Sequence, residues 1–147
     1  MKNKSKSFKI AVFIIIAILL LAQAIRIDRS NPPVRSDLPN SVTAKPILQR
    51  ACYNCHSNGT VWPWYSGVAP VSWLVGSDVE EGRRNLNFSE WGDYDSGTQI
   101  HKLRGIAEEV QDGEMPPWYY TMVHPSSRLS PSERDRILAW TRAGSGN

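Results

Sequence analysis

The stretch that decides the fold is Cys52-Tyr53-Asn54-Cys55-His56. Its two cysteines are the only ones among 147 residues, and the chain has three histidines, so coincidence explains this grouping poorly. The two-residue gap sets two sulfur atoms about one helical turn apart, and an imidazole follows directly. This is the C-x-x-C-H signature, in which two thiols bond covalently to haem and the histidine binds its iron. We therefore expect one haem c on Cys52 and Cys55, with His56 as the proximal iron ligand.

Three other interpretations of the two cysteines stay open at this stage. A thioredoxin-like pair would start a helix that follows a strand, but no strand pattern surrounds residues 52–55, and His56 would have no task. A zinc site would need a fourth ligand, which His101 or His124 could supply, although the Cys-His adjacency suits tetrahedral geometry poorly. A disulfide would close a very small loop and would give little entropic stabilisation.

Outside the motif, the sequence predicts helices joined by Pro- and Gly-rich loops. The helix that carries the motif should start near residues 43–44, with Pro46 tolerated in its first turn. Both sulfur atoms then fall on the apolar face of that helix and point to the interior. A second helix is expected from Ser72, although Gly76 and Gly82 weaken this prediction.

Two later helices have clear ends. The first runs from about Thr98 to Asp112 and is stopped by Gly113. Its apolar stripe consists of Ile100, Leu103, Ala107 and Val110. The second begins where Ser130 can cap, Pro131 fits the first position and Glu133 closes a capping box. With no alternating strand pattern, the fold class is predicted to be all-α.

The first 25 residues have the layout of an export signal or an N-terminal membrane anchor. Four lysines precede an uncharged run from Ile10 to Ile25, and lysines of this kind stay on the cytoplasmic side. As a helix the run would span about 24 Å, which is short for a hydrocarbon core of about 30 Å. Ala22-Gln23-Ala24 also resembles a small-x-small cleavage site. Either interpretation places the following domain on the periplasmic side of the bacterial inner membrane.

Residues 26–41 form a polar stretch that contains Asn31-Pro32-Pro33 and Pro39. Prolines stiffen such a segment, so we interpret it as a linker that leads into a haem c-binding domain at residues 42–144. The net charge of +3 belongs to the leader, because residues 25–147 hold 13 basic and 14 acidic side chains. No basic stripe with interleaved aromatic residues remains, so nucleic acid is not an expected partner.

Met115 is the candidate for the second axial position on the iron. It lies in Gly113-Glu-Met-Pro-Pro117, on a loop that two prolines hold extended, so binding would cost little ordering entropy. The rivals are Met122, His101 and His124. His101 should face solvent because it lies roughly 160° from the apolar stripe of its helix. Histidine and methionine ligation would raise the reduction potential relative to two histidines.

The surroundings of the haem are predicted less directly. His56 should donate its free ring N–H to a backbone carbonyl, which we place in the loop of residues 62–70. Arg83 and Arg84 could neutralise haem propionates or could be solvated at a helix end. Four aromatic side chains are expected to pack around the porphyrin: Trp62, Trp64, Tyr65 and Trp73.

Several linked motifs resemble the bacterial haem-binding domain family of cytochrome c-like proteins. They are Asn31-Pro-Pro33, Ala51-Cys-Tyr-Asn-Cys-His-Ser57, Trp62-Pro-Trp-Tyr-Ser66, Ala69-Pro-Val-Ser-Trp73, Asn87-Phe-Ser-Glu-Trp91, Gly113-Glu-Met-Pro116 and His124-Pro125. The resemblance covers about residues 31–140. It implies a small cytochrome c-like helical domain wrapped around one covalent haem, often behind an N-terminal membrane anchor. Cys52, Cys55 and His56 match the attachment motif of the family, and Met115 matches its Met-Pro motif.

The expected function is the transfer of single electrons by a carrier that is not an enzyme, because no group of carboxylates or bases suggests catalysis. Its partners would be redox proteins of unknown identity, and the N-terminal segment would contact the membrane. The alternative is a module that binds or senses a gas or peroxide, if Met115 does not occupy the iron. A thiol–disulfide oxidoreductase is the third class.

Overall fold

A computed structural model describes the backbone of residues 2–146 and the side chains of residues 6–146. Within the described backbone all regular elements are helices and no strand occurs, which confirms the all-helical class. Lys2 and Lys4, part of the lysine-bearing start, lie outside the described side chains. The α-helices and short 3-10 helices (η) follow the order α1 (Lys2–Ala22), α2 (Lys45–Ala51), α3 (Tyr53–His56), η1 (Trp64–Gly67), α4 (Val71–Asn85), η2 (Phe88–Asp93), α5 (Ser96–Asp112), α6 (Trp118–Val123), η3 (Pro125–Ser127) and α7 (Pro131–Ser145).

The chain divides into two compact units, each built from two stretches of sequence. The smaller unit consists of Met1–Ser30 and Trp62–Asp78, and the larger of Asn31–Val61 and Val79–Asn147. The larger unit contains the Cys-x-x-Cys-His motif, Met115 and the main apolar core. The candidate site residues therefore belong to one unit.

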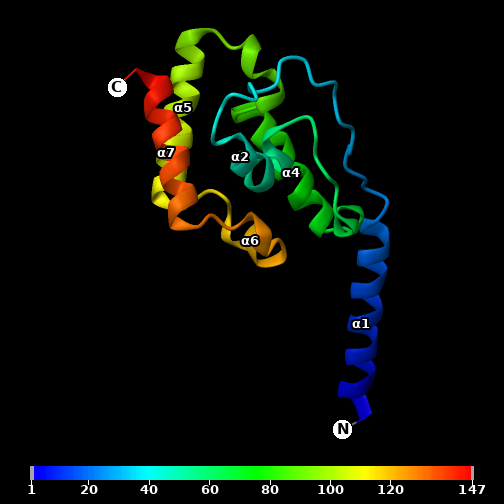
Figure 1. Ribbon diagram of the computed structural model, residues 1–147. Coiled ribbons are helices and arrows are strands. Elements are labelled where there is room, and N and C mark those ends of the chain that lie inside the picture. Colours follow the sequence, from blue (N-terminus) through cyan, green and yellow to red (C-terminus); the bar gives the residue numbers. More distant parts are fainter. Residues whose placement is uncertain (1, 147) are drawn as a thin grey trace. The chain divides into compact units, whose positions relative to one another are not determined.

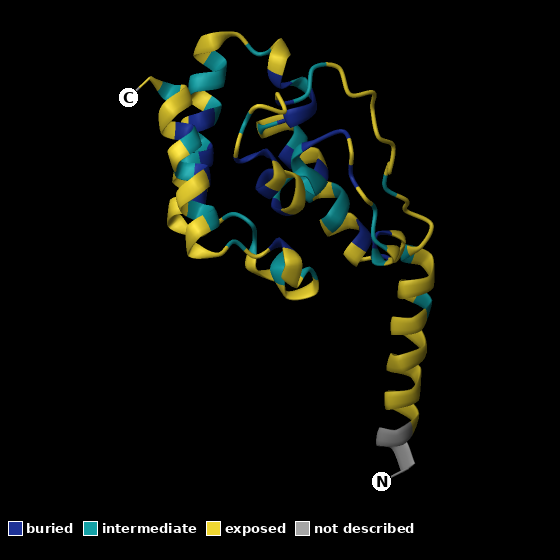
Figure 2. Ribbon diagram, viewed as in Figure 1, coloured by how far each residue is buried: buried dark blue, intermediate teal, exposed yellow. Residues whose placement is uncertain are grey.

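The core of the larger unit includes the interface of α5 and α7, which lie side by side and antiparallel (Figure 1). The facing sides of these helices are buried and their outer sides are exposed (Figure 2). Gly144 permits a close approach, because a Cβ at this position would lie 2.6 Å from Leu103 Cδ1. The buried apolar side chains of the core are Leu38, Ala44, Ile47, Leu48, Phe88, Trp91, Leu103, Ile106, Val110 and Ile137.

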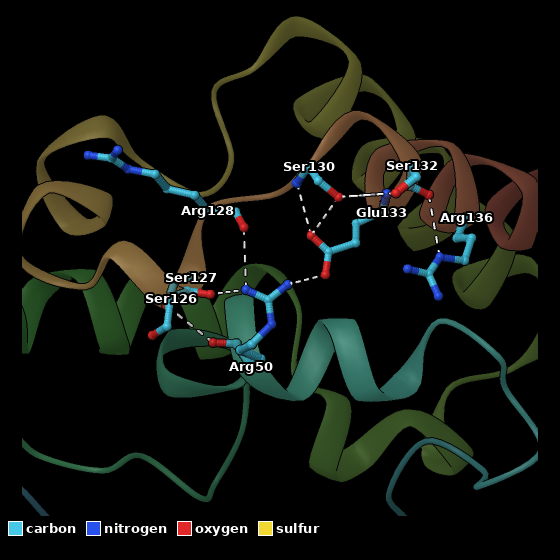
Figure 3. Close-up of polar contacts among 8 residues, drawn as sticks. All are labelled: Arg50, Ser126, Ser127, Arg128, Ser130, Ser132, Glu133 and Arg136. Atoms are coloured by element: carbon cyan, nitrogen blue, oxygen red, sulfur yellow. Dashed lines mark hydrogen bonds and ion pairs between the residues drawn. The ribbon is translucent and has the colours of Figure 1, made fainter.

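Side-chain and glycine caps close the ends of α5 and the start of α7; the stop at Gly113 was predicted, whereas the cap at Asp95, which starts α5 two residues before the expected Thr98, was not. Asp95 accepts a hydrogen bond from Thr98 N at 2.8 Å, and Gly113 ends α5 with a left-handed φ of 78°. Ser130 Oγ accepts from Glu133 N at 3.3 Å, and Glu133 Oε2 accepts from Ser130 N at 2.9 Å (Figure 3). The predicted capping box is confirmed.

Arg50 joins the end of α2 to the start of α7 (Figure 3). Its guanidinium group forms an ion pair with Glu133 and donates to the carbonyl oxygen of Ser126. In return, Ser127 Oγ donates to the carbonyl oxygen of Arg50 at 3.2 Å. Because Arg50 lies two residues before Cys52, these contacts anchor the helix that leads into the motif.

The second half of the predicted linker packs within the larger unit. Leu38 is buried in the core, and its backbone N donates to Phe88 O at 3.1 Å. The backbone N atoms of Arg35 and Ser36 both donate to Ser89 O, at 3.1 and 3.0 Å. These bonds tie the stretch before α2 to η2.

In the smaller unit, the residues that follow α1 pair with the segment at residues 62–78. Gln23 bonds to both backbone groups of Ala69: Nε2 donates to the carbonyl oxygen at 3.1 Å, and Oε1 accepts from the amide at 3.0 Å. Trp73 Nε1 donates to Ile25 O at 3.1 Å. Upstream, α1 is exposed along most of its described length (Figure 2).

The predicted N-terminal membrane segment is not found. Among the helices of the described residues, none combines the length and the apolar character that crossing a bilayer requires.

Candidate haem-attachment site

The Cys-x-x-Cys-His motif lies at the junction of α2 and α3. Cys52 has φ −123°, outside the helical region, and it separates the two helices. The backbone N atoms of Cys55 and His56 both donate to Cys52 O, at 3.1 and 2.9 Å, which closes a single helical turn. The motif therefore forms the expected turn, but the helix that was predicted to run through both cysteines is interrupted at the first.

Both cysteines are half-buried, and neither forms a disulfide bond. Burial, followed by the neighbouring Cys55, raises the pKa of the Cys52 thiol from 9.0 to about 12, so this thiol keeps its proton at neutral pH. Thiol–disulfide enzymes rely instead on a thiolate of lowered pKa. No three His, Cys, Asp or Glu side chains among the described residues gather closely enough to hold a metal ion. The geometry thus favours neither the thioredoxin-like nor the zinc interpretation.

The ring of His56 is oriented by two backbone carbonyl groups. Its Nδ1 lies 3.0 Å from Gly82 O, in the last turn of α4, and 3.2 Å from Leu86 O, just beyond that helix. Because a carbonyl oxygen can only accept, we assign the hydrogen to Nδ1, which leaves the lone pair on Nε2. Burial lowers the pKa of His56 and so favours the neutral ring that binds metals. Metal-binding histidines are commonly oriented in this way.

The prediction that the partner of His56 lies in the loop at residues 62–70 was wrong. The partner carbonyls belong to Gly82 and Leu86, because the end of α4 lies directly against the motif. A Cβ on residue 82 would come within 2.6 Å of Cys55 O, so only glycine allows this approach. The sequence did contain a signal, namely the glycine that weakened the helix prediction.

Arg83 holds the loop that follows the motif. Its Nε donates to Ser57 O at 2.8 Å, and its Nη2 donates to Thr60 Oγ1 at 2.9 Å and to Asn31 Oδ1 at 2.8 Å. Sequence reasoning offered only a propionate contact or solvation for this side chain, whereas the structure gives it a bracing role. Arg84 is exposed at the end of α4.

A buried amide network, which sequence reasoning missed, supports the motif. Asn87 Nδ2 donates to Asn58 Oδ1 at 2.9 Å, Asn58 Nδ2 donates to Pro33 O at 2.9 Å, and Asn58 N donates to Ser89 Oγ at 3.0 Å. Both asparagines are buried, and their bonds compensate for the loss of water. The signal was present in the sequence, because Pro33 and Asn87 belong to the family motifs quoted above.

Tyr53, between the two cysteines, takes part in a second network. Its hydroxyl donates to Asp37 Oδ1 at 3.0 Å, and the other oxygen of Asp37 lies 2.7 Å from Lys45 Nζ. Lys45 is only 7% exposed, and it also donates to Leu38 O and to Asn40 Oδ1. Burial, followed by the hydrogen bond and charge of Asp37, raises the pKa of Tyr53. The phenol therefore remains protonated beside the motif.

Met115 is half-buried and lies just after α5. The backbone N atoms of Glu114 and Met115 both donate to Glu109 O, at 3.0 and 3.1 Å. Arg134 from α7 donates to Val110 O at 3.1 Å and satisfies another carbonyl of the same helix end. The backbone at Met115 is thus tied back to α5.

The rival axial ligands differ in their surroundings. His101 is exposed, as its position on the helix predicts. Met122 is 62% exposed on α6. His124 is half-buried, and its ring stacks on Tyr120 with 4.5 Å between ring centroids. Of the two methionines whose side chains are described, Met115 is the less exposed.

The aromatic residues that were predicted to pack around porphyrin belong to the smaller unit, where their exposure varies widely. Trp64 is largely exposed, and Tyr65 is half-buried. Trp62 Nε1 is buried without a hydrogen-bond partner among the described residues. Buried indole donors are normally paired, and Trp62 Nε1 is a buried donor for which the described residues supply no acceptor.

Comparison with known proteins identifies the family. The profile of the haem-binding domain family matches residues 12–143, and the chain therefore belongs to this family. The chain is also similar to cytochrome c peroxidase Ccp of Escherichia coli (strain K12), with 27% identity over 97 residues, which are 64% of this chain and 21% of that protein. The chain thus spans about a fifth of that relative's length. No solved structure matches.

The residues of the motif fit a haem on chemical grounds. Two cysteines without a disulfide lie on one helical turn. Burial favours the neutral form of the adjacent imidazole, whose Nδ1 faces two carbonyl oxygens so that the lone pair is on Nε2. These groups are the sulfur and nitrogen donors that a covalently attached haem uses. Cys52 and Cys55 would hold the macrocycle, and His56 would hold the iron.

Proposed function

We propose that this protein carries one covalent haem c on Cys52 and Cys55 and transfers single electrons, with His56 and Met115 as the axial ligands of the iron. The observation that carries the proposal is the His56 ring, whose Nδ1 is oriented by the carbonyl oxygens of Gly82 and Leu86 while Nε2 carries the lone pair, beside two cysteines that form no disulfide. When bound, haem supplies a one-electron redox couple at its iron.

Each thiol is suited to form a thioether bond. Its sulfur and its hydrogen would add across one vinyl group of the haem, so the reaction balances without an oxidant or a leaving group. The short turn between Cys52 and Cys55 holds the two sulfur atoms on one segment, and Arg50 anchors the helix that leads to it. The protein's own contribution is to present two sulfur atoms and one oriented imidazole together.

We further propose that the protein is a carrier rather than an enzyme, that its partners are redox proteins, and that it works on the periplasmic side of the bacterial inner membrane. The location is supported by the lysine-bearing start and the uncharged run from Ile10 to Ile25, which have the layout of an export leader. The carrier role is supported by the sequence, in which no group of carboxylates or bases suggests catalysis.

A haem protein that reacts with peroxide is the second candidate. It is favoured by the name of the similar E. coli protein, a cytochrome c peroxidase. This function would require an open axial position, and therefore a Met115 that does not stay on the iron. Carbon monoxide binding to the reduced protein separates the candidates: slow or absent binding supports the carrier, whereas fast binding together with peroxide turnover supports the second function.

The covalent haem is tested by the intact mass of protein exported from a host that matures c-type cytochromes. We expect a mass increase of one haem and two sulfur atoms that resist alkylation. The variant with both Cys52→Ala and Cys55→Ala should lose the added mass. A colourless wild-type protein with two alkylatable thiols would overturn the proposal. The intact mass also reports where the mature chain begins.

A further inference from the structure

Asn54, between the two cysteines, has a carboxamide of defined orientation. Its backbone oxygen accepts from Thr60 Oγ1 at 2.8 Å, and its side-chain Oδ1 accepts from Val61 N at 3.1 Å. Because a backbone amide can only donate, the oxygen of the carboxamide must face Val61. The NH2 group is then directed to Tyr120, and Nδ2 donates to the Tyr120 hydroxyl oxygen at 2.7 Å.

Tyr120 belongs to α6, which follows directly after Met115-Pro-Pro117. Its ring stacks on His124, with 4.5 Å between centroids and 28° between ring planes. In addition, His124 N donates to Tyr120 O at 2.9 Å. These contacts fix the direction of the phenol, so that its hydroxyl meets a residue 66 positions earlier in the chain.

Apolar burial contributes little to holding α6. Trp118, Met122 and Val123 are 72%, 62% and 61% exposed. Since hydrophobic stabilisation scales with the apolar area removed from water, these side chains anchor the helix weakly. The hydrogen bond between Asn54 and Tyr120 therefore matters more for placing α6 next to the motif than it would for a helix with a buried apolar face.

We infer that Asn54 and Tyr120 form a latch that keeps the Met115 segment at the haem-attachment motif, and that Tyr120 is a positioning residue for the sixth ligand. Met115 lies between two anchors: Glu109 O binds the backbone N of Met115 itself, and the latch binds the segment five residues later. The inference rests on the proposed function, because it takes Met115 as an iron ligand.

Opening the latch should let Met115 leave the iron more readily. Imidazole competes with methionine for ferric iron, so its apparent affinity reports how firmly Met115 is held. In haem-loaded Tyr120→Phe we expect that affinity to rise by roughly 2- to 10-fold, the factor by which one hydrogen bond shifts an equilibrium. The iron spectrum in the absence of imidazole should show a larger fraction without methionine.

Matched variants test whether the effect belongs to this bond. Asn54→Leu should raise imidazole affinity as Tyr120→Phe does, and the double variant should add little, because both changes remove one interaction. Asn54→Asp should stay close to the wild type, because the Tyr120 hydroxyl can donate to a carboxylate while Val61 keeps its acceptor. Tyr119→Phe makes the same chemical change one residue earlier and should have no such effect.

Two results would overturn the latch: wild-type imidazole affinity in Tyr120→Phe, or an equal rise in Tyr119→Phe. Failure of the proposed function looks different, because Met115→Ala would then bind imidazole no more tightly than the wild type. Haem content and far-UV circular dichroism identify variants that do not mature. Should Asn54→Leu be one of them, the contrast between Tyr120→Phe and Asn54→Asp decides.

Discussion

Gly82 lies so close to Cys55 that a Cβ at position 82 would be 2.6 Å from the Cys55 carbonyl oxygen and 3.1 Å from its Cβ. The nearest of these atoms is backbone, which cannot move aside as the tip of a long side chain can. The same close approach brings Gly82 O within 3.0 Å of His56 Nδ1. A missing methyl group in α4 thus underlies the orientation of the imidazole.

Gly82→Ala should therefore damage the site. The added methyl group must push α4 away from the motif, and overpacking of this kind costs about 1–3 kcal/mol. We expect a lower midpoint of thermal unfolding and a lower yield of haem-loaded protein. One preparation gives both measurements. Calorimetry gives the midpoint, and the ratio of haem absorbance to protein concentration gives the haem loading.

Gly105→Ala supplies the matched control. Gly105 lies within α5, and a Cβ there would meet nothing within 4 Å. Alanine at this position should stabilise the helix by about 0.5–1 kcal/mol, because glycine loses more conformational entropy on folding. A stabilising Gly82→Ala would contradict the close contact with Cys55.

Met115→Ala should change the haem properties strongly if Met115 is the sixth ligand. Methionine raises haem potentials, so its loss should lower the reduction potential by on the order of 0.1 V, within the span of about 0.8 V that axial ligands cover. The reduced protein should also bind carbon monoxide faster. Met122→Ala removes a methionine that is 62% exposed and should alter neither measurement; the reverse pattern would make Met122 the ligand.

The buried ion pair of Lys45 and Asp37 should respond asymmetrically to mutation. Asp37→Ala leaves the ammonium group of Lys45, which is buried, without its counter-charge, whereas Lys45→Met leaves a carboxylate that is partly in water. Removing one partner of a buried pair costs up to about 3–5 kcal/mol, and the solvent around Asp37 should reduce this to about 2 kcal/mol. Denaturant unfolding should show a larger loss for Asp37→Ala than for Lys45→Met. Equal losses would argue that the ammonium group is well solvated.

Local chemistry made much of this fold predictable. The capping box of Ser130 and Glu133 and the stop at Gly113 depend only on neighbouring residues, and the structure has them where the sequence indicates. The turn between Cys52 and Cys55 follows from spacing alone. Each of these features spans only a few positions, so one sequence contains the whole signal.

Contacts between distant segments could not be predicted from local sequence patterns. The partner of His56 lies 26 residues away and depends on how α4 approaches the motif. Tyr120 meets Asn54 across 66 positions, and Arg50 meets Glu133 across 83. No local periodicity encodes these distances, because they follow from how packed helices bring separate segments together.

Glu133 should make stability depend on pH in the acid range. Hydrogen bonds from the backbone and then the hydroxyl of Ser130, together with the nearby Arg50, lower the pKa of Glu133 from its ordinary 4.5. A carboxyl group whose folded pKa is lowered stabilises the fold above its unfolded pKa. This contribution is lost as the pH falls through the folded value. The capping box should therefore weaken below about pH 4.5.

Glu133→Gln tests this directly, because glutamine can still accept a hydrogen bond but cannot ionise. The midpoint of thermal unfolding should be lower in the variant at pH 6, and the difference from the wild type should shrink as the pH approaches 3. Glu108→Gln, on the exposed face of α5, controls for the loss of one negative charge. A difference that stays constant from pH 6 to pH 3 would mean that the charge of Glu133 adds nothing to the cap, and that the geometry of its hydrogen bonds suffices.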